Sequence, residues 1–312
     1  MRDGRADKQN AGARNIQRTL KTIILAALLF FIGRYVWQEW QAVERANMPD
    51  PLWFGGGTVF ALGSMLVSMA AYRAIICGHG ARIAYSKTLA VFFLPLLGKY
   101  VPGKIWSVVA AVEMYHRLGI ARRIGTACIT LFMALGLASA ILVTLAFGMP
   151  AAGPWTTIGA AGLLAPILAV VLWPRAFYAA LNRALRLLRK EPIATRLSAA
   201  RLLRVLATLT GARLSYGLAF CLLVMSVARV ELSAWPGLIA LFTFAQIAGL
   251  LALFAPAGLG VREGVLLVGL QPLVGPGPAI VITAVCRFWQ TTLELIMAAI
   301  GWWALRKSKP PA

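Results

Sequence analysis

Eight ionisable side chains lie within or beside otherwise apolar stretches of this 312-residue chain. Charge is costly in an apolar environment unless it serves binding or pairing, so each is a candidate for function. The basic candidates, which would bind an anionic substrate, are Lys99, Lys104, Arg213, Arg262 and Arg287. The acidic candidates, which would act as counter-charges or take up a coupling proton, are Glu113, Glu263 and Glu294.

Two stretches that carry these charges also contain residues that break helices: LGKYVPGKIW at 97–106 and FAPAGLGVREG at 254–264. Proline removes a backbone donor and glycine adopts conformations that other residues avoid. The predicted breaks are Pro102, Gly103, Pro256, Gly258 and Gly260. We expect two helical hairpins whose exposed helix ends and cations neutralise an anionic group. Tyr100 and Trp106 are interpreted as aromatics of the membrane interface.

The same charges allow structural interpretations. Lys99 and Lys104 would extend to the interface if the first hairpin is shallow. Arg213 would anchor the cytosolic end of its helix. Arg287 and Glu294 lie seven residues apart, on one helical face, and would pair with other charges to hold the bundle together.

The composition identifies the surroundings that these residues must occupy. The chain is 60% hydrophobic and 13% charged, against about 25% charged residues in soluble domains. The stretches 52–72, 124–149 and 155–173 contain no charged side chain, and about 20 apolar residues span a bilayer as a helix. An all-α polytopic membrane protein follows. The net charge of +21 is spread along the flanks of apolar spans, which favours topology signals over nucleic-acid binding.

The distribution of lysine and arginine predicts the topology. Residues 1–21 hold six basic and two acidic residues and are expected in the cytosol. The segment 88–112 has basic residues on both flanks, so it must enter and leave the membrane on the cytosolic side. The count of spans requires that 237–277 enter and leave the membrane on the opposite side. We therefore predict six full transmembrane helices, two re-entrant hairpins and cytosolic termini in the plasma (inner) membrane.

The two halves of this pattern match in opposite orientation, which predicts an inverted-topology repeat. Secondary transporters of this design bind substrate near the midplane, between the repeats. Residues 174–205 form a basic amphipathic segment at the inner interface, or a connector packed on the protein. The predicted units are a cytosolic tail at 1–21, a first membrane repeat at 22–147, a second at 148–305, and a cytosolic tail at 306–312.

Metal and catalytic chemistry find little support in the sequence. The four cysteines are scattered without a CxxC pair, and His79 and His116 fall near span ends, where we expect no acidic or cysteine partner. The chain has ten acidic residues and no DxD motif, although transferases and phosphatases need clustered acids or a catalytic set. We expect no metal, no cofactor and no enzymatic activity.

The stretches LPLLGKYVPGKIWSVVAAVEMYHRLGI at 94–120 and FAPAGLGVREGVLLVGL at 254–270 resemble the two signatures of the lysylphosphatidylglycerol synthase membrane-domain family, also described as flippase-like. The resemblance implies a polytopic protein that handles lipids. It does not imply lysylphosphatidylglycerol synthesis, because the 312 residues contain no counterpart of the family's soluble aminoacyl-transfer domain.

These observations predict a transporter or flippase-like protein for an anionic lipid or a lipid-linked glycan precursor, with membrane lipids as partners. An accessory subunit of a lipid or glycan biosynthetic enzyme is the alternative, with segment 174–205 as its docking surface. A polyprenyl-phosphate-dependent transferase is less favoured.

Overall fold

The structure, a computed structural model, describes residues 49–100, 105–148, 162, 173–187, 192, 196–252 and 255–307. The secondary structure of these residues is entirely helical. The longer helices are α2 (Pro51–Gly78), α5 (Arg122–Phe147), α8 (Ala199–Val227), α9 (Trp235–Leu251) and α11 (Pro276–Lys307). The shorter elements are α3 (Tyr85–Leu96), η1 (Leu97–Tyr100), α4 (Ile105–Arg117), α7 (Pro174–Leu187), η2 (Leu232–Ala234), η3 (Pro256–Gly258) and α10 (Val261–Val274).

Five of the described helices are long and apolar enough to cross a membrane: α2, α5, α8, α11, and α9 together with η2. This finding confirms a multi-pass helical membrane protein. The predicted spans at 22–37 and 155–173 lie outside the described residues, apart from Gly162 and Trp173. The predicted tail at 1–21 and most of the tail at 306–312 lie outside them as well.

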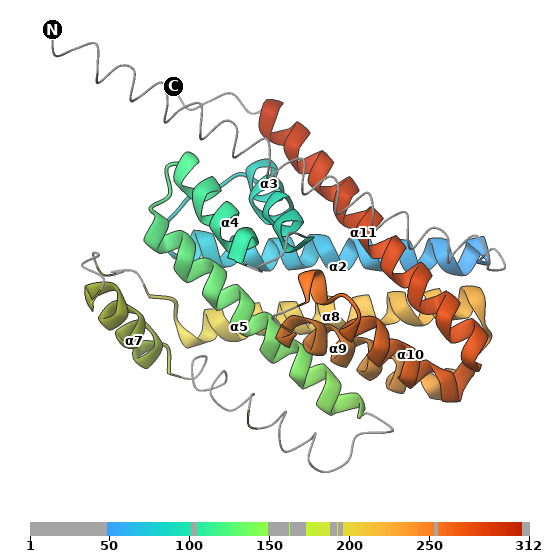
Figure 1. The fold of residues 1–312 in the computed structure, drawn as a ribbon. Coiled ribbons are helices and arrows are strands. Elements are labelled where there is room, and N and C mark those ends of the chain that lie inside the picture. Colours follow the sequence, from blue (N-terminus) through green and yellow to red (C-terminus); the bar gives the residue numbers. More distant parts are fainter. Residues whose placement is uncertain are drawn as a thin grey trace, which may run out of the picture.

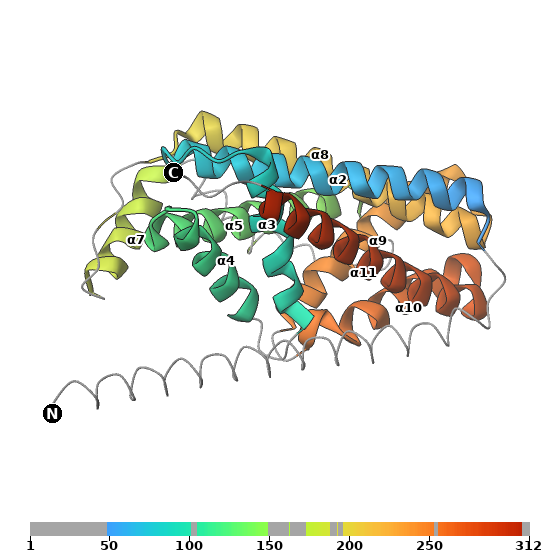
Figure 2. The same ribbon diagram turned by 90° about the horizontal axis from the view of Figure 1, so that it is seen from above.

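Helices α2 and α8 lie side by side and antiparallel along their length (Figures 1 and 2). The N–H of Asp50 donates to the carbonyl of Ser226 at 2.8 Å, and Ser64 Oγ donates to the carbonyl of Ala212 at 2.7 Å. Gly57 allows this approach, because a Cβ there would meet the carbonyl oxygen of Ala219 at 3.0 Å. The two helices form a rigid layer against which the other elements pack.

Two pairs of helices, each interrupted by a short 3-10 turn, pack against α2, α5, α8 and α11. The first helix pair consists of α3, η1 and α4, and the second consists of α9, η3 and α10. The two helices of each pair contact each other across their break, and the breaks themselves meet where η1 contacts η3. Helix α11 packs along α3, and α5 packs along α9 (Figure 1). The charged residues of η1, α10 and α11 are thereby brought into one region.

Backbone contacts at glycine close both helix pairs. A Cβ on Gly98 would meet the backbone N of Ser107 at 2.7 Å, so η1 lies directly on the first turn of α4. A Cβ on Gly258 would meet Cα of Gly249 at 2.8 Å, so η3 lies directly on the end of α9. The sequence identified Gly258 as a break but did not identify Gly98.

Candidate functional site

A cavity of about 340 Å³ lies where the two helix pairs meet. Residues from α2, α3, α4, α5 and α9 form its walls, and most of them are apolar. Tyr72, Phe92 and Phe132 pack their rings against one another with centroids 4.9 to 5.4 Å apart. The aliphatic part of the wall comes from Val91, Pro95, Leu96, Val108, Ala111, Ile129, Met133 and Leu250. Such a cavity is in the size range of small-ligand sites.

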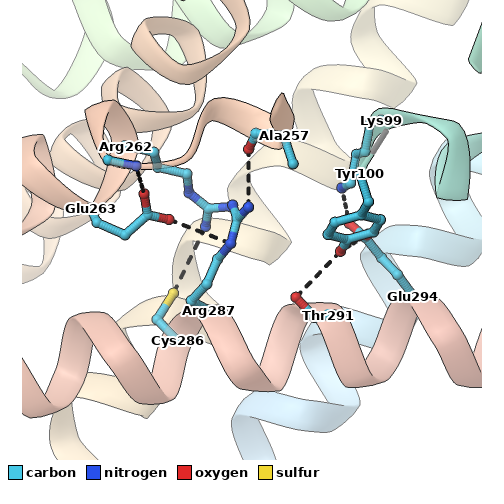
Figure 3. A network of polar contacts seen from close by, with 10 residues as sticks. Lys99, Tyr100, Ala257, Arg262, Glu263, Cys286, Arg287, Thr291 and Glu294 are labelled. Atoms are coloured by element: carbon cyan, nitrogen blue, oxygen red, sulfur yellow. Dashed lines mark hydrogen bonds and ion pairs between the residues drawn. The ribbon is translucent and has the colours of Figure 1, made fainter. Parts of the chain in front are cut away.

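Three cations from three different elements also line this cavity: Lys99 of η1, Arg262 of α10 and Arg287 of α11. The sequence separates Lys99 from the arginines by more than 160 residues, and the contact between η1 and η3 brings them together. Figure 3 shows Arg262 and Arg287 close together beside Ala257, and Lys99 on the other side of Ala257, directed toward Glu294 of α11. The cavity therefore has an apolar wall and a cationic group of side chains.

Lys99 is paired across the cavity with a carboxylate of α11. Its Nζ lies 2.5 Å from Oε1 of Glu294, whose Oε2 accepts a hydrogen bond from the Tyr100 hydroxyl at 2.8 Å. The Tyr100 hydroxyl also lies 3.3 Å from Oγ1 of Thr291 (Figure 3). These contacts tie the break of the first helix pair to α11. Tyr100 is buried, at 6% exposure, so its interpretation as an interfacial aromatic is wrong, whereas Trp106 is exposed.

Arg287 is paired with a carboxylate of α10. Its Nε lies 3.4 Å from Oε1 of Glu263, and its Nη2 donates to the carbonyl of Ala257 at 3.1 Å. The other oxygen of Glu263 accepts from the N–H of Gly260 at 2.7 Å, which satisfies a free donor where α10 begins. Arg262 and Glu263, within the predicted hairpin stretch 254–264, lie in the first turn of α10.

Arg262 has no carboxylate within ion-pair distance among the described residues. It is 6% exposed, its Nη2 lies 3.9 Å from Sγ of Cys286, and its guanidinium stands 5.6 Å from the ring centroid of Phe242. Its Nε has no hydrogen-bond partner. The guanidinium groups of Arg262 and Arg287 lie next to each other in Figure 3. Arg262 is thus a buried cation with no counter-charge in the described part of the chain.

Comparison with known protein families identifies the chain. The sequence model of the lysylphosphatidylglycerol synthase TM region matches residues 18–298, which include both helix pairs and all three cavity cations. The chain belongs to this family. No curated protein matches its sequence. The resemblance noted in the sequence is thereby confirmed.

Two further candidates of this family member lie away from the cavity wall. Nη2 of Arg213, on α8, donates to the carbonyl of Gly136 on α5 at 3.3 Å. Glu113 is exposed on α4 and pairs with Arg122 at 3.2 Å and Arg117 at 3.4 Å. The hydrogen bond from Arg122, together with Arg117, lowers the pKa of Glu113. Their roles in substrate binding and coupling stay predictions, and Pro102, Gly103 and Lys104 lie outside the described residues.

The second break of this family member holds a strained residue. Ala257 has φ 50° and ψ 20°, and it is the one non-glycine residue with positive φ in the described part of the chain. Its carbonyl accepts from Arg287, so the strain holds an oxygen in place for a cavity cation. Positive φ is a consequence of the tight turn that η3 makes onto α9.

We therefore expect Ala257→Gly to raise the free energy of unfolding by about 1 kcal/mol, because glycine adopts this conformation without steric cost. Thermal unfolding in detergent micelles measures the change. Ala252→Gly is the matched control, since Ala252 has an ordinary φ of −70° and is buried. The control should lower stability by about 1 kcal/mol. A loss of stability in Ala257→Gly as large as in the control would contradict this interpretation.

His79 has neighbours that the sequence did not indicate. Its Nδ1 lies 3.6 Å from Sγ of Cys128, and its Nε2 lies 2.8 Å from the Tyr178 hydroxyl. All three side chains are buried, and the Tyr178 contact fixes α7 against the end of α2. The expectation that no cysteine lies near His79 is therefore wrong.

Proposed function

We propose that this protein is a lipid translocator of the flippase type, in which the charged head group of an anionic lipid passes through the cavity between the two helix pairs. One observation carries the proposal. A largely apolar cavity joins the breaks of both helix pairs and is lined by two buried arginines and the partly exposed Lys99, and one of the arginines has no counter-charge among the described residues. Apolar walls suit the hydrocarbon part of a lipid, and buried cations attract its head group strongly in a medium of low dielectric.

The proposal includes six spans with two re-entrant hairpins, formed by the two helix pairs. A non-helical backbone within a membrane is tolerable where it is buried in protein or lines a cavity. Ala257 of η3 and Lys99 of η1 both line the cavity, which supports this placement. The alternative is that α9, with η2, crosses the membrane as an ordinary span, as its length and composition allow.

The packing of the elements supports an inverted repeat. Helix α11 packs on α3 as α5 packs on α9, and α10 packs on α11 as α4 packs on α5. Two further central contacts, α2 with α8 and η1 with η3, join equivalent elements of the two halves, whereas the packing of α5 on α8 has no counterpart of similar extent between α11 and α2. A two-fold relation between repeats of opposite orientation produces this pattern, and it places the substrate near the membrane midplane.

In the proposed orientation the protein lies in the plasma (inner) membrane with both termini in the cytosol. Exposed arginines gather where α4 ends, α5 begins and α8 begins, namely Arg117, Arg122, Arg201 and Arg204. The opposite end of α8 precedes the acidic side chain of Glu231. The excess of positive charge on one side fits the cytosolic face.

The test is leaflet exchange in proteoliposomes. Purified protein should accelerate the exchange of a fluorescent anionic phospholipid between leaflets at least tenfold over protein-free vesicles. Arg262→Ala and Lys104→Ala should each remove most of this acceleration, whereas Arg117→Ala, which removes an exposed cation on α4, should keep it. Full exchange in both Arg262→Ala and Lys104→Ala would contradict the proposed path.

The accessory-subunit alternative rests on α7, whose Arg175, Arg183 and Arg186 are exposed while Tyr178 holds it to the protein. A protein that only anchors an enzyme would give no exchange in vesicles. A transferase would convert the labelled lipid, and chromatography of the extracted lipid after the assay detects that product. Exchange of chemically unchanged lipid supports the translocator over both.

A further inference from the structure

We infer that the cavity takes a head group with one negative charge, a phosphodiester, and that Arg262 is its principal contact. This inference deepens the proposed function, because it rests on the same cavity being the ligand site. It adds the net charge of the ligand's head group and names the residue that binds this charge.

The inference starts from the charges of the cavity. Among the residues that the structure describes, three cations line it, and two carboxylates lie within ion-pair distance of them. Each carboxylate has its own partner, since Glu294 pairs with Lys99 and Glu263 pairs with Arg287. The carboxylate oxygens are further occupied by Tyr100 and by the N–H of Gly260. One positive charge, on Arg262, is left over.

The position of Arg262 makes the leftover charge significant. The side chain is more than nine-tenths buried, and its Nε finds no acceptor. A buried charge without a partner costs several kcal/mol, and the neighbouring guanidinium of Arg287 adds repulsion between like charges (Figure 3). A single bound anion would remove both penalties. A dianion would bring one negative charge too many, and a zwitterion would leave the excess positive charge in place.

The chemistry of arginine favours a phosphodiester among monoanions. The planar guanidinium presents donors that match two oxygens of a phosphate group. A phosphomonoester carries about −1.5 to −2 at neutral pH and so exceeds the charge that the cavity leaves open. A diester also carries a second substituent, and Gln246 and Ser107 line the same cavity as polar groups for a hydroxylated one. The aromatic wall faces the hydrocarbon part.

Phosphodiesters of this kind have two sources in a membrane, glycerophospholipids and polyprenyl-linked phosphosugars. Both present one charge between an apolar and a polar substituent. The cavity would bind both kinds of phosphodiester, so the probes must distinguish glycerophospholipids from polyprenyl-linked phosphosugars.

The experiment measures binding to the purified protein in detergent at pH 8, by the quenching of tryptophan fluorescence. Four probes are used: dioctanoyl phosphatidylglycerol, dioctanoyl phosphatidic acid, dioctanoyl phosphatidylcholine, and farnesyl phosphoryl-glucose. We expect phosphatidylglycerol to bind at least tenfold more tightly than the dianionic or the zwitterionic phospholipid. Farnesyl phosphoryl-glucose binding more tightly still would identify the polyprenyl source, and weaker binding would identify the glycerophospholipid source.

Variants that change the net charge of the cavity test whether this charge determines which lipid is preferred. Glu263→Gln removes one negative charge, so phosphatidic acid should become the preferred phospholipid. Arg262→Gln removes the excess positive charge, so the advantage of phosphatidylglycerol over phosphatidylcholine should fall below threefold, and Arg262→Lys should keep most of it. Arg117→Gln, which removes an exposed cation, should leave the wild-type order unchanged.

Equal binding of all three phospholipids by the wild-type protein would overturn the inference, even if no variant could be purified. An unchanged order in both Glu263→Gln and Arg262→Gln would overturn it as well. The proposed function fails separately. Binding that selects monoanionic lipid without leaflet exchange would contradict the proposed translocation and support the inference about Arg262. Leaflet exchange without such selectivity would support translocation and contradict the inference.

Discussion

Gly258→Ala is expected to lower the free energy of unfolding by about 3 kcal/mol and to abolish leaflet exchange. Gly258 has φ +73°, a conformation that costs an L-residue about 1–2 kcal/mol. The added Cβ would also meet Cα of Gly249 at 2.8 Å and its carbonyl oxygen at 3.0 Å. These are backbone atoms of α9, so the clash moves η3 off α9 instead of turning a side chain. The break that carries Ala257 would shift with it.

Gly260→Ala separates the two parts of this effect. Gly260 has φ +81°, and no described atom lies within 4 Å of the position of its Cβ. The control should therefore lose only the conformational part, about 1–2 kcal/mol, and should retain exchange. Thermal unfolding in detergent micelles and the vesicle assay measure both variants. Equal stability of the two variants would show that the contact between η3 and α9 is not tight.

Most long helices could be predicted, because an uninterrupted apolar stretch in the sequence is enough to indicate a membrane-spanning helix. The charge-free stretch at 52–72 lies within α2, and the predicted span at 124–147 matches α5 within two residues. Helix α8 begins six residues before its predicted start at 205. Arg201 and Arg204 fall in the basic segment predicted at 174–205, but they belong to α8, because a helix continues beyond the apolar region when its end is capped. The side chain of Ser198 supplies that cap, with Oγ accepting from the N–H of Arg201 at 3.3 Å.

The pairing of the charges could not be predicted, because it depends on contacts between distant segments. The cost of charge in an apolar span indicates that Lys99, Arg287 and Glu294 need partners, but not which ones. The 195 residues between Lys99 and Glu294 are bridged only once α11 packs along α3. Tyr100 had no local signal for burial, since tyrosine beside a lysine is also typical of an interface.

Breaking the pair between Lys99 and Glu294 is the second change with a large expected effect. Among the described residues, Lys99→Met leaves the Glu294 carboxylate, 13% exposed, with the Tyr100 hydroxyl as its one partner. Glu294→Gln leaves the Lys99 ammonium group, 30% exposed. Removing one partner of a buried pair costs about 3–5 kcal/mol. Because Lys99 is partly exposed, we expect about 2–3 kcal/mol for each single variant.

The double variant Lys99→Met/Glu294→Gln should recover most of this loss. It leaves no uncompensated charge, and pairs of this kind are often replaced by apolar or neutral groups at little cost. We expect it to lie within about 1 kcal/mol of the wild type, which gives a coupling energy of about 4 kcal/mol between the two positions. Tyr100→Phe, which removes one hydrogen bond to Glu294, should cost about 1 kcal/mol. Strictly additive losses in the double variant would show that the two side chains do not interact.

The double variant also separates stability from transport. The neutral pair leaves the net charge of the cavity at +1, because one positive and one negative charge are removed together. The excess charge on Arg262 therefore persists, and the valence of the preferred lipid should not change. The pair also holds η1 against α11, so its loss frees the break of the first helix pair to move. A changed rate of exchange with an unchanged preference for monoanionic lipid would show two separate roles. Arg262 would select the charge of the head group, and the pair of Lys99 and Glu294 would hold the break of the first helix pair in place.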